Sequence, residues 1–361
     1  MENNILVFFL GTKAQFIKTI PVMNSINHRQ LNVLLYDTCQ HQDITIKQLG
    51  SISTEFKHIK LSKNTKSAKN MIQIIKWFLS LLISLRRKEF KLENNNKSLC
   101  IIHGNTLSTV AGLIWAKINK IRILHIEGGY RSFNWFKPFP EEIIRYFISK
   151  YSNYVICFDD NSQENLKNMK IKGEIIRISR NTIFDTIPKE LNTNENSESK
   201  LIISIHRNEN VYSKKIMAEL VDFIIKLKQS YFENITWYLH THTLSNLKKN
   251  NLLIKLQKNS INTQQLIDHE QFIKELHSSD CVLTDGESVL EECSIIGVPT
   301  YALLDDLENK SSYSNNIFLS KYAHKESEEF FKNLKNFREP KKISNSSSPS
   351  KEISEVINNI I

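Results

Sequence analysis

HGNTLSTVAGLIWAKINKIRILHIEGGYRSFNWFKPFPEE occupies residues 103–142 and decides the fold. It holds two glycine-containing turns, each directly after a short apolar run, and it ends in two adjacent carboxylates behind a proline. An apolar run, a glycine turn, a helix and a second apolar run with its own glycine turn form an α/β unit. In such units ligands meet the chain at the carboxyl ends of the strands, so we expect a functional site in this stretch.

The same alternation continues on both sides of this stretch. In the first half it predicts strands at 5–10, 31–36, 98–102, 121–126 and 153–158 and helices at 14–27, 66–88, 107–117 and 141–151. After the polar segment 190–200 it predicts strands at 201–205, 235–239, 281–283 and 300–303 and helices at 214–232 and 288–296. The pattern predicts an α/β protein with two Rossmann-like, doubly wound domains.

The length of 361 residues suits two domains better than one core. We expect an N-terminal domain over 1–180 and a C-terminal, nucleotide-binding domain over 181–343. Residues 344–361 read as a serine-rich linker and a terminal helix that packs back on the first domain.

The formal net charge is +10, and the basic residues are spread along the chain instead of forming one block. The simplest interpretation is a solvated basic surface. The sharper one is attraction to an anionic partner, namely a nucleotide, a polyanionic glycan or an acidic membrane surface. No nucleic-acid partner is predicted.

Five scattered cysteines form no CxxC pair, which predicts reduced thiols and a cytoplasmic setting. The first apolar run is too short for a signal peptide and lacks a basic leader, so it reads as a strand. The apolar run 75–85 is too short to span a bilayer.

Several residues that could carry chemistry follow predicted strands directly. Glu127 follows the strand 121–126, and His206 and His240 each end a predicted strand of the second domain. Glu141 is weaker evidence, because acids are favoured in the first turn of any helix. His240-Thr241-His242 could suggest a metal, but the spacing supplies no third ligand, and no metal site is predicted.

The order of motifs resembles the non-hydrolysing UDP-N-acetylglucosamine 2-epimerase family. The resemblance covers most of the chain, and the motifs that carry it are Gly11-Thr12-Lys13-Ala14-Gln15, Gln40-His41, His103-Gly104-Asn105-Thr106, Glu127-Gly128-Gly129-Tyr130-Arg131-Ser132, Pro140-Glu141-Glu142 with Arg145, Asn181-Thr182 with Asp185, His206-Arg207-Asn208-Glu209-Asn210, and Asp285-Gly286-Glu287-Ser288 with Glu291-Glu292. The resemblance implies two lobes facing a central cleft, as in GT-B glycosyltransferases. It also implies inversion of the sugar C2 by elimination and re-addition of UDP.

The resemblance also implies roles for individual residues. Glu127 and Glu141 would be the acid/base carboxylates, with His206 and Arg145 at the junction of sugar and diphosphate. Glu292 would hold the ribose hydroxyls. The remaining residues of the implied catalytic and substrate-binding set are Asn105, Lys13, Gln40, His41, His240, Gly286 and Ser288. No cofactor is implied, and a homodimer is a further implication.

Five departures from the family pattern bear on the reaction, and one of them is Arg180, which replaces a glycine and adds bulk where the backbone is normally free. Asn105 stands where the family has an aspartate, and an amide cannot act as a base. Lys13 replaces an arginine, which loses bidentate phosphate recognition. Gln15 replaces a glutamate, and Glu287 puts a negative charge where the diphosphate is expected.

Three functions therefore stay open at this point. The first is a 2-epimerase acting on a UDP-sugar for envelope polysaccharide synthesis. The second is a glycosyltransferase that adds an activated sugar to a glycan or lipid-linked acceptor, with the helix 66–88 and its basic end docking on the inner face of an anionic membrane. The third is a catalytically silent sugar-nucleotide sensor. The sequence His-Ile-Glu-Gly-Gly at His125–Gly129 also resembles the hydrolysing epimerases. The sequence Pro-Phe-Pro-Glu-Glu at Pro138–Glu142 favours the non-hydrolysing branch.

Overall fold

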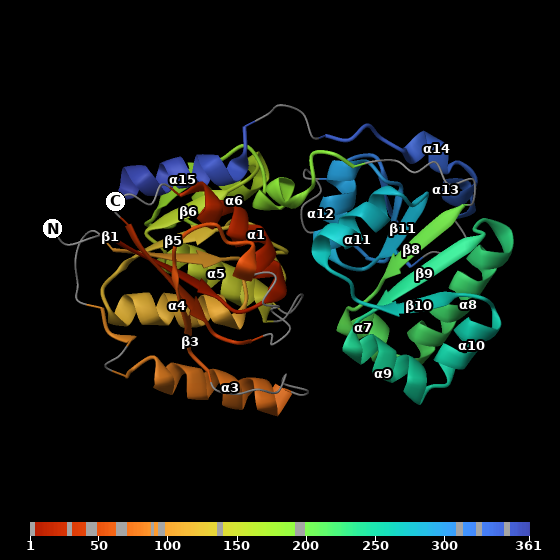
Figure 1. The fold of residues 1–361 in the computed structure, drawn as a ribbon, viewed down its shortest axis with the longest axis horizontal. Helices are drawn as coiled ribbons and strands as arrows, with labels where there is room; N and C mark the ends of the chain where they lie inside the picture. The colour runs from red at the N-terminus through yellow and green to blue at the C-terminus, as the bar shows by residue number, and fades with distance from the viewer. Residues whose placement is uncertain are drawn as a thin grey trace. The chain divides into compact units, whose positions relative to one another are not determined.

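A computed structural model describes residues 4–26, 31–40, 49–62, 71–87, 90–92, 98–135, 140–191, 199–307, 313–322, 327–342 and 347–361. The chain forms two compact units. The first contains residues 1–186 and 347–361, and the second contains residues 187–346. Figure 1 shows each unit as a sheet flanked by helices.

The first unit is built on a seven-stranded sheet in the order β3-β2-β1-β4-β5-β6-β7, with every neighbouring pair parallel. Its strands are β1 (Asn4–Leu10), β2 (Leu31–Asp37), β3 (Lys57–Lys60), β4 (Leu99–His103), β5 (Arg122–Ile126), β6 (Tyr154–Cys157) and β7 (Glu174–Arg177). The central strands β1 and β4 are buried on both faces, which is why they read as continuous apolar runs.

Helices cover both faces of this sheet. They are α1 (Lys13–Ser25), α3 (Met71–Ser84), α4 (Leu107–Ile118), α5 (Glu141–Tyr151), α6 (Asp160–Asn168) and α15 (Pro349–Ile360), with a 3-10 turn η2 (Thr182–Thr186). One apolar core joins α1 and α15 to the sheet, and a second joins α3, α4 and α5 to the opposite face.

The second unit holds a six-stranded parallel sheet in the order β10-β9-β8-β11-β12-β13. Its strands are β8 (Lys200–Ser204), β9 (Asn234–Leu239), β10 (Asn262–Gln265), β11 (Cys281–Thr284), β12 (Thr300–Ala302) and β13 (Ile317–Leu319). Its helices are α7 (Asn208–Val211), α8 (Lys214–Ser230), α9 (Thr241–Lys249), α10 (Leu252–Lys258), α11 (His269–His277), α12 (Glu287–Ile296), α13 (Glu328–Lys332) and α14 (Leu334–Phe337). Two parallel, doubly wound sheets confirm the predicted fold class.

The elements absent from the sequence prediction are short or polar. The edge strand β10 has the sequence NTQQ, and β3 has KHIK, so neither carries an apolar run. Edge strands bury less surface than central strands, and their sequences carry a weaker signal. The short helices α6, α9 and α11 were missed for a related reason, since none spans more than 9 residues.

The terminal helix α15 belongs to the first unit. Ser348 caps its first turn, and Ile353 and Ile357 are fully buried in the core beside α1. Asp185 accepts hydrogen bonds from the Ser348 hydroxyl at 2.9 Å and the Ser350 N–H at 2.8 Å, which fixes the start of the helix. None of the helices in the described part of the chain combines the length and the apolar character that crossing a bilayer requires.

Candidate active site

Glu127 lies directly after β5, at the edge of the sheet where β1, β4 and β5 all end. Its backbone is left-handed, with φ of 73°. Residues other than glycine rarely adopt this backbone conformation, and those that do cluster at functional sites. The next turn requires Gly129, because a Cβ at its position would come within 2.4 Å of the Ser162 carbonyl oxygen. This tight turn projects the Glu127 carboxylate from the strand end.

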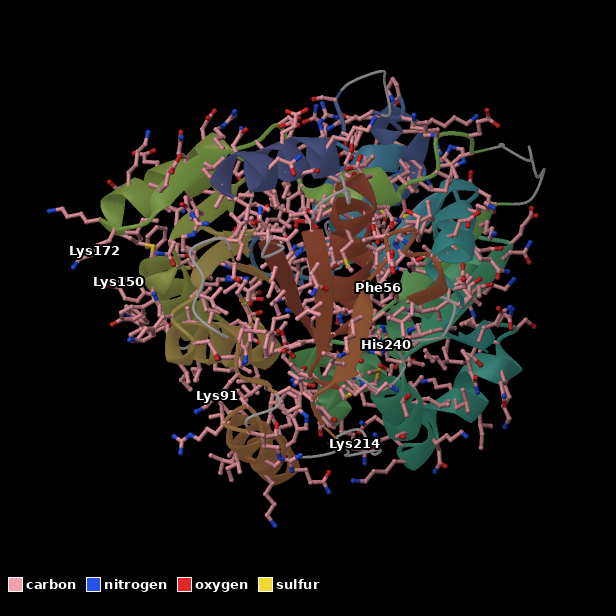
Figure 2. The ribbon with its side chains drawn as sticks, turned by 60° about the vertical axis from the view of Figure 1, so that its left-hand side comes forward. Phe56, Lys91, Lys150, Lys172, Lys214 and His240 are labelled. Carbon is pink, nitrogen blue, oxygen red and sulfur yellow. The ribbon has the colours of Figure 1, made fainter. Side chains whose placement is uncertain are left out.

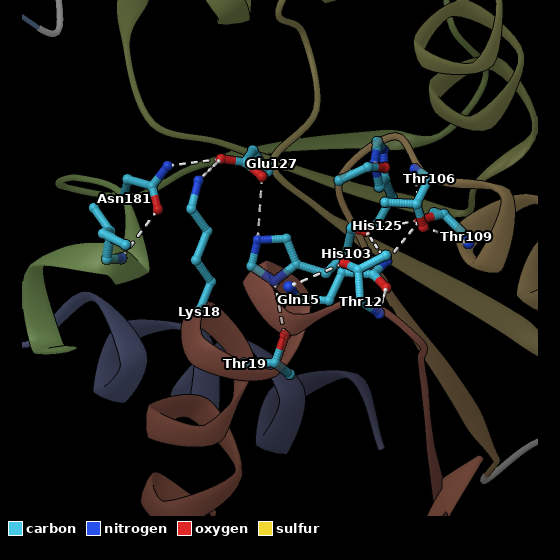
Figure 3. A network of polar contacts seen from close by, with 12 residues as sticks. Thr12, Gln15, Lys18, Thr19, His103, Thr106, Thr109, His125, Glu127 and Asn181 are labelled. Carbon is cyan, nitrogen blue, oxygen red and sulfur yellow. Dashed lines mark hydrogen bonds and ion pairs between the residues drawn. The ribbon is translucent and has the colours of Figure 1, made fainter. Parts of the chain in front are cut away.

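Three side chains surround the Glu127 carboxylate (Figure 3). Lys18 Nζ lies 2.6 Å from Oε1, and the Asn181 amide donates to the same oxygen at 2.8 Å. His103 Nε2 lies 3.3 Å from the other oxygen, Oε2. Lys18 comes from α1, His103 from the end of β4 and Asn181 from the chain just before η2, so the fold brings together three distant segments.

These neighbours keep Glu127 ionised. Burial raises the pKa of its carboxyl group, but the charge of Lys18 and the hydrogen bond and charge of His103 outweigh burial. The net pKa lies well below its ordinary value. In this conformation Glu127 is therefore a carboxylate throughout the physiological pH range.

Gln15 connects the turn after β1 to the turn after β4. Its amide oxygen accepts from the N–H groups of Gly11 and Thr12, and its amide nitrogen donates to the His103 carbonyl at 2.8 Å and to Thr109 Oγ1 at 3.0 Å. An ionised carboxylate could not donate to that carbonyl. Gln15 is therefore suited to this position as a structural link.

His125 supports the same turn from β5. Burial lowers its pKa to about 4, so the ring is neutral near pH 7. Its Nε2 lies 2.9 Å from the Gly104 carbonyl oxygen and must carry the proton, since that oxygen can only accept.

The adjacent acids Glu141 and Glu142 begin α5 but have different surroundings. Glu142 is fully buried. It forms an ion pair with Arg131, whose Nε lies 2.5 Å from its Oε1 atom, and its Oε2 atom accepts from the backbone N–H of Ser132 at 3.0 Å. It therefore fixes the loop that follows Glu127. Glu141 has a buried Oε2 atom with no hydrogen-bond partner in the described part of the chain.

Asn105 contacts Arg145, the other cation of this region. With its amide oxygen turned toward the guanidinium, it accepts from Nε at 2.8 Å and from Nη2 at 3.1 Å. Arg145 Nη1 also lies 3.8 Å from Glu142. Asn105 thus acts as a neutral acceptor for a half-buried cation.

Two other predicted residues of the first unit, Lys13 and Gln40, lie at the same edge of the sheet. Lys13 is half-buried at the first position of α1. The Gln40 amide oxygen accepts from the Ser108 hydroxyl at 2.7 Å and the Ser108 N–H at 3.2 Å, where α4 begins. His41 lies outside the described residues.

In the second unit, Asp285 organises the loops that follow β8 and β11. It is fully buried and accepts from the backbone N–H groups of His206 and Arg207, both at 2.9 Å, and from the Asn210 amide at 2.9 Å. His206 Nδ1 lies 3.3 Å from its Oδ1 atom. Burial lowers the pKa of His206, and Asp285 opposes this effect only in part.

Three histidines of this unit, His206, His240 and His242, lie together. The His206 ring stacks on that of His240, with centroids 4.6 Å apart, and His242 Nε2 lies 2.7 Å from the His206 carbonyl oxygen. Gly286 leaves room for the His206 ring, since a Cβ there would come within 2.7 Å of His206 Cε1 and the ring would have to shift. In the described residues no group of three or more His, Cys, Asp or Glu side chains could hold a metal ion.

Helix α12 carries the remaining predicted residues. Ser288 is its second residue, and Glu292, one turn further on, is buried with His269 Nε2 at 2.8 Å from its Oε1 atom. Glu287 puts a negative charge near the expected diphosphate, but this charge is paired with a cation. Arg207 Nη2 lies 3.3 Å from Glu287 Oε1.

Sequence reasoning missed three residues of these clusters as functional candidates. Lys18 and Asn181 bind Glu127, and Asp285 holds His206. A signal for Lys18 was present, because Gln15, Lys18 and Thr19 are three and four positions apart and therefore share one face of α1. A polar face on a helix that packs against a sheet indicates buried polar contacts.

Comparison with known proteins relates the chain to one family. The family model described as UDP-N-acetylglucosamine 2-epimerase matches residues 25–351. A UDP-N-acetylglucosamine 2-epimerase from Methanocaldococcus jannaschii is 26% identical over 317 residues, which cover 84% of each chain. The M. jannaschii enzyme solved with UDP-GlcNAc and UDP superposes with a TM-score of 0.81 at 22% identity, covering 98% of this chain and 99% of the other. The calicheamicin glycosyltransferase superposes with a TM-score of 0.55 at 11% identity, covering 100% and 98%, and shares the fold alone.

Proposed function

Because the chain belongs to the UDP-N-acetylglucosamine 2-epimerase family, we propose that it inverts C2 of a UDP-N-acetylhexosamine. In the first step a base takes the C2 proton while the C1–O bond breaks and UDP leaves. In the second step UDP re-forms the bond at C1, and a proton is delivered to the other face of C2. The reaction needs carboxyl groups that exchange protons and donors that stabilise the departing diphosphate.

The ionised Glu127 carboxylate carries this proposal. It stands at the end of β5 in a left-handed backbone conformation, with Lys18 beside it. We assign it the role of the base. We assign Glu141 the role of the second proton carrier, because it begins α5 in the same stretch of chain and its Oε2 atom is buried.

We assign diphosphate and ribose binding to the second unit. The start of α12 at Ser288 offers its backbone N–H to phosphate oxygens, whereas the Gly286 N–H already donates to Thr284 Oγ1 at 3.0 Å. His206 lies next to Gly286 with His240 stacked on it, and we assign Glu292 to accept from ribose hydroxyls through the oxygen that His269 does not contact. In the first unit, Lys13, Arg145 and Gln40 remain predicted substrate-binding residues.

The comparisons do not favour the transferase hypothesis. The curated relative reported above carries the epimerase name, and the glycosyltransferase shares only the fold. An epimerase also needs no glycan or lipid-linked acceptor.

The proposal is tested by incubating the protein with UDP-N-acetylglucosamine in deuterated water and following C2 by NMR. We expect deuterium at C2 and the appearance of UDP-N-acetylmannosamine. Free UDP with free sugar would indicate hydrolysis, and no exchange without an acceptor would overturn the proposal. Glu127→Gln should lower the exchange rate by about 10²- to 10⁴-fold. Glu219→Gln, which changes an exposed carboxylate on α8, is the matched control.

We further propose that the protein acts in the cytoplasm as a homodimer. All five cysteines are free thiols, as a reducing compartment would keep them. The outer surfaces of α3, α4 and α5, which we call the three-helix face, expose large apolar side chains: Ile75, Leu79, Ile83, Ile118, Phe147 and Tyr151. Burial of a broad, apolar face formed by packed helices is typical of homodimers.

The three-helix face also bears on the membrane hypothesis. Its exposed charged residues within the helices are basic, namely Lys76, Lys117 and Lys150, and Figure 2 shows Lys150 at the outer margin of the first unit. An anionic membrane is therefore the alternative occupant of this face.

A further inference from the structure

Beneath Glu127 lies a second layer of polar side chains to which the reaction described above assigns no part. His103 is 1% exposed, and its Nδ1 atom lies 2.8 Å from Thr19 Oγ1. Its other ring nitrogen, Nε2, lies 3.3 Å from Glu127 Oε2. Thr19 is itself fully buried on α1. Figure 3 shows the three side chains in line, from α1 through the end of β4 to the turn after β5.

Hydrogen-bond roles along this line follow from the charge of Glu127. A carboxylate can only accept, so His103 must present a proton on Nε2. In a neutral ring Nδ1 is then an acceptor, and the Thr19 hydroxyl must donate to it. The backbone of His103 is fixed as well, because its carbonyl oxygen accepts from Gln15 Nε2 at 2.8 Å and from Thr109 Oγ1 at 2.8 Å. Both ends of the residue are therefore held.

The arrangement engages the two carboxylate oxygens of Glu127 separately. Lys18 and Asn181 hold Oε1, and His103 faces Oε2. A carboxylate with a neighbour at each oxygen has less freedom to rotate, and a base must keep a defined plane to meet a C–H bond at the right angle. Any buried histidine needs partners for its ring nitrogens, and the distinguishing feature here is that one of the two nitrogens of His103 faces the carboxylate of Glu127.

We propose that His103 is a positioning residue for the Glu127 carboxylate and that Thr19 selects the tautomer with which it does so. The proposal rests on the proposed function, since it concerns the base of that reaction. The positioning role goes beyond the proposed function because it gives two buried residues, His103 and Thr19, a part in the reaction.

The kinetic test uses paired variants of each residue. Thr19→Val removes the hydroxyl and keeps the shape, and we expect kcat for C2 exchange to fall about tenfold with little change in KM, while Thr19→Ser keeps wild-type activity. His103→Leu should lower kcat by about 10²-fold. His103→Gln, which keeps a donor near the Nε2 position, should recover most of that loss. Equal losses in Leu and Gln, or a change confined to KM, would overturn the proposal.

The acidic limb of the kcat profile gives a readout that simple packing would not move. His103 helps to hold the pKa of Glu127 down, together with Lys18, against the effect of burial. The groups that face His103 are Glu127, Thr19 and the neutral ring of His125. His103→Leu should therefore move the acidic limb to higher pH, and an unchanged limb contradicts the assigned contact.

A measurement without turnover separates this inference from the proposed function. In protein labelled with ¹⁵N at histidine, the signal that disappears in His103→Gln should show a proton on Nε2. The chemical shift of this signal should change in Glu127→Gln. In Thr19→Val the signal should report a different ratio of the two His103 tautomers. If wild-type protein gives no C2 exchange but these shifts appear, the reaction is wrong and the positioning contact stands. If exchange occurs and the Thr19→Val signal matches wild type, the reaction stands and the positioning role is wrong.

Discussion

At the scale of single residues, the surroundings of a carboxylate decide what it can do. Glu142 is held by Arg131 and by backbone N–H groups, so its charge is committed to the loop. Glu127 faces Lys18 and is kept ionised at a strand end. Both residues are buried acids in one stretch of sequence, and only their contacts separate a structural acid from a candidate base.

Replacing Lys18 should change the pH dependence of activity. Lys18→Met removes the charge that lowers the pKa of Glu127 most, while the effect of burial, which raises it, remains. The pKa of Glu127 must then rise, so the acidic limb of kcat moves to higher pH. Lys18→Arg keeps the charge and should leave the limb near its wild-type position. A kcat profile of Lys18→Met that overlays wild type would show that the ion pair does not set the basicity of Glu127.

Replacing Asn105 tests whether the amide is an acceptor for Arg145 or a lost catalytic acid. We expect Asn105→Asp to keep C2 exchange within a few-fold of wild type, because a carboxylate also accepts from Arg145 Nε and Nη2. Asn105→Ala leaves the guanidinium without this acceptor and should lower exchange by about tenfold. A large gain in Asn105→Asp would instead show that the position needs a proton-transfer group.

At the scale of elements, long apolar strands and amphipathic helices could be predicted, and short edge elements could not. The sequence predicted α5 over its full range and β1, α4 and α8 within two residues at either end. It missed β3 and β10, which lie at the edges of their sheets. Central strands are buried on both faces and carry strong apolar runs, whereas a polar edge strand is selected by its neighbour in the sheet.

Helix α15 should contribute strongly to the stability of the first unit. Ile353 and Ile357 are fully buried in the core beside α1, so Ile→Ala at either position removes apolar contacts and leaves a cavity. We expect a loss of about 2–5 kcal/mol in the free energy of unfolding for each variant. Urea denaturation measures it, with Lys351→Ala on the exposed side of the helix as the control. A loss below about 1 kcal/mol would mean that α15 is only loosely docked.

At the scale of the whole molecule, the net charge of +10 and the apolar three-helix face have opposite effects on self-association. Like charges oppose self-association, and exposed apolar side chains favour it. In the proposed homodimer, burial of these apolar side chains would have to outweigh repulsion between lysines, which are flexible and can extend away from an interface.

Light scattering after gel filtration tests this assembly. Wild type should have twice the chain mass of 42.1 kDa, and Leu79→Lys and Ile83→Lys should shift it to the mass of one chain. Ile254→Lys on α10 changes a residue of the same exposure as Leu79, 53%, and should remain dimeric. A monomeric wild type that binds vesicles containing phosphatidylserine, and loses this binding in Leu79→Lys, would assign the face to a membrane instead.

The sequence by itself determined the alternation of strands and helices and the placement of Glu127, His206 and His240 at strand ends. These features depend on periodicity and on neighbouring residues, which are local in the chain. The tertiary structure alone decided that Lys18 pairs with Glu127, 109 positions away, and that Glu142 is bound to Arg131 while a Glu141 oxygen lacks a partner in the described residues. Such pairs form only when packing brings separate segments together, because side-chain hydrogen bonds and ion pairs depend on distances that no local pattern encodes.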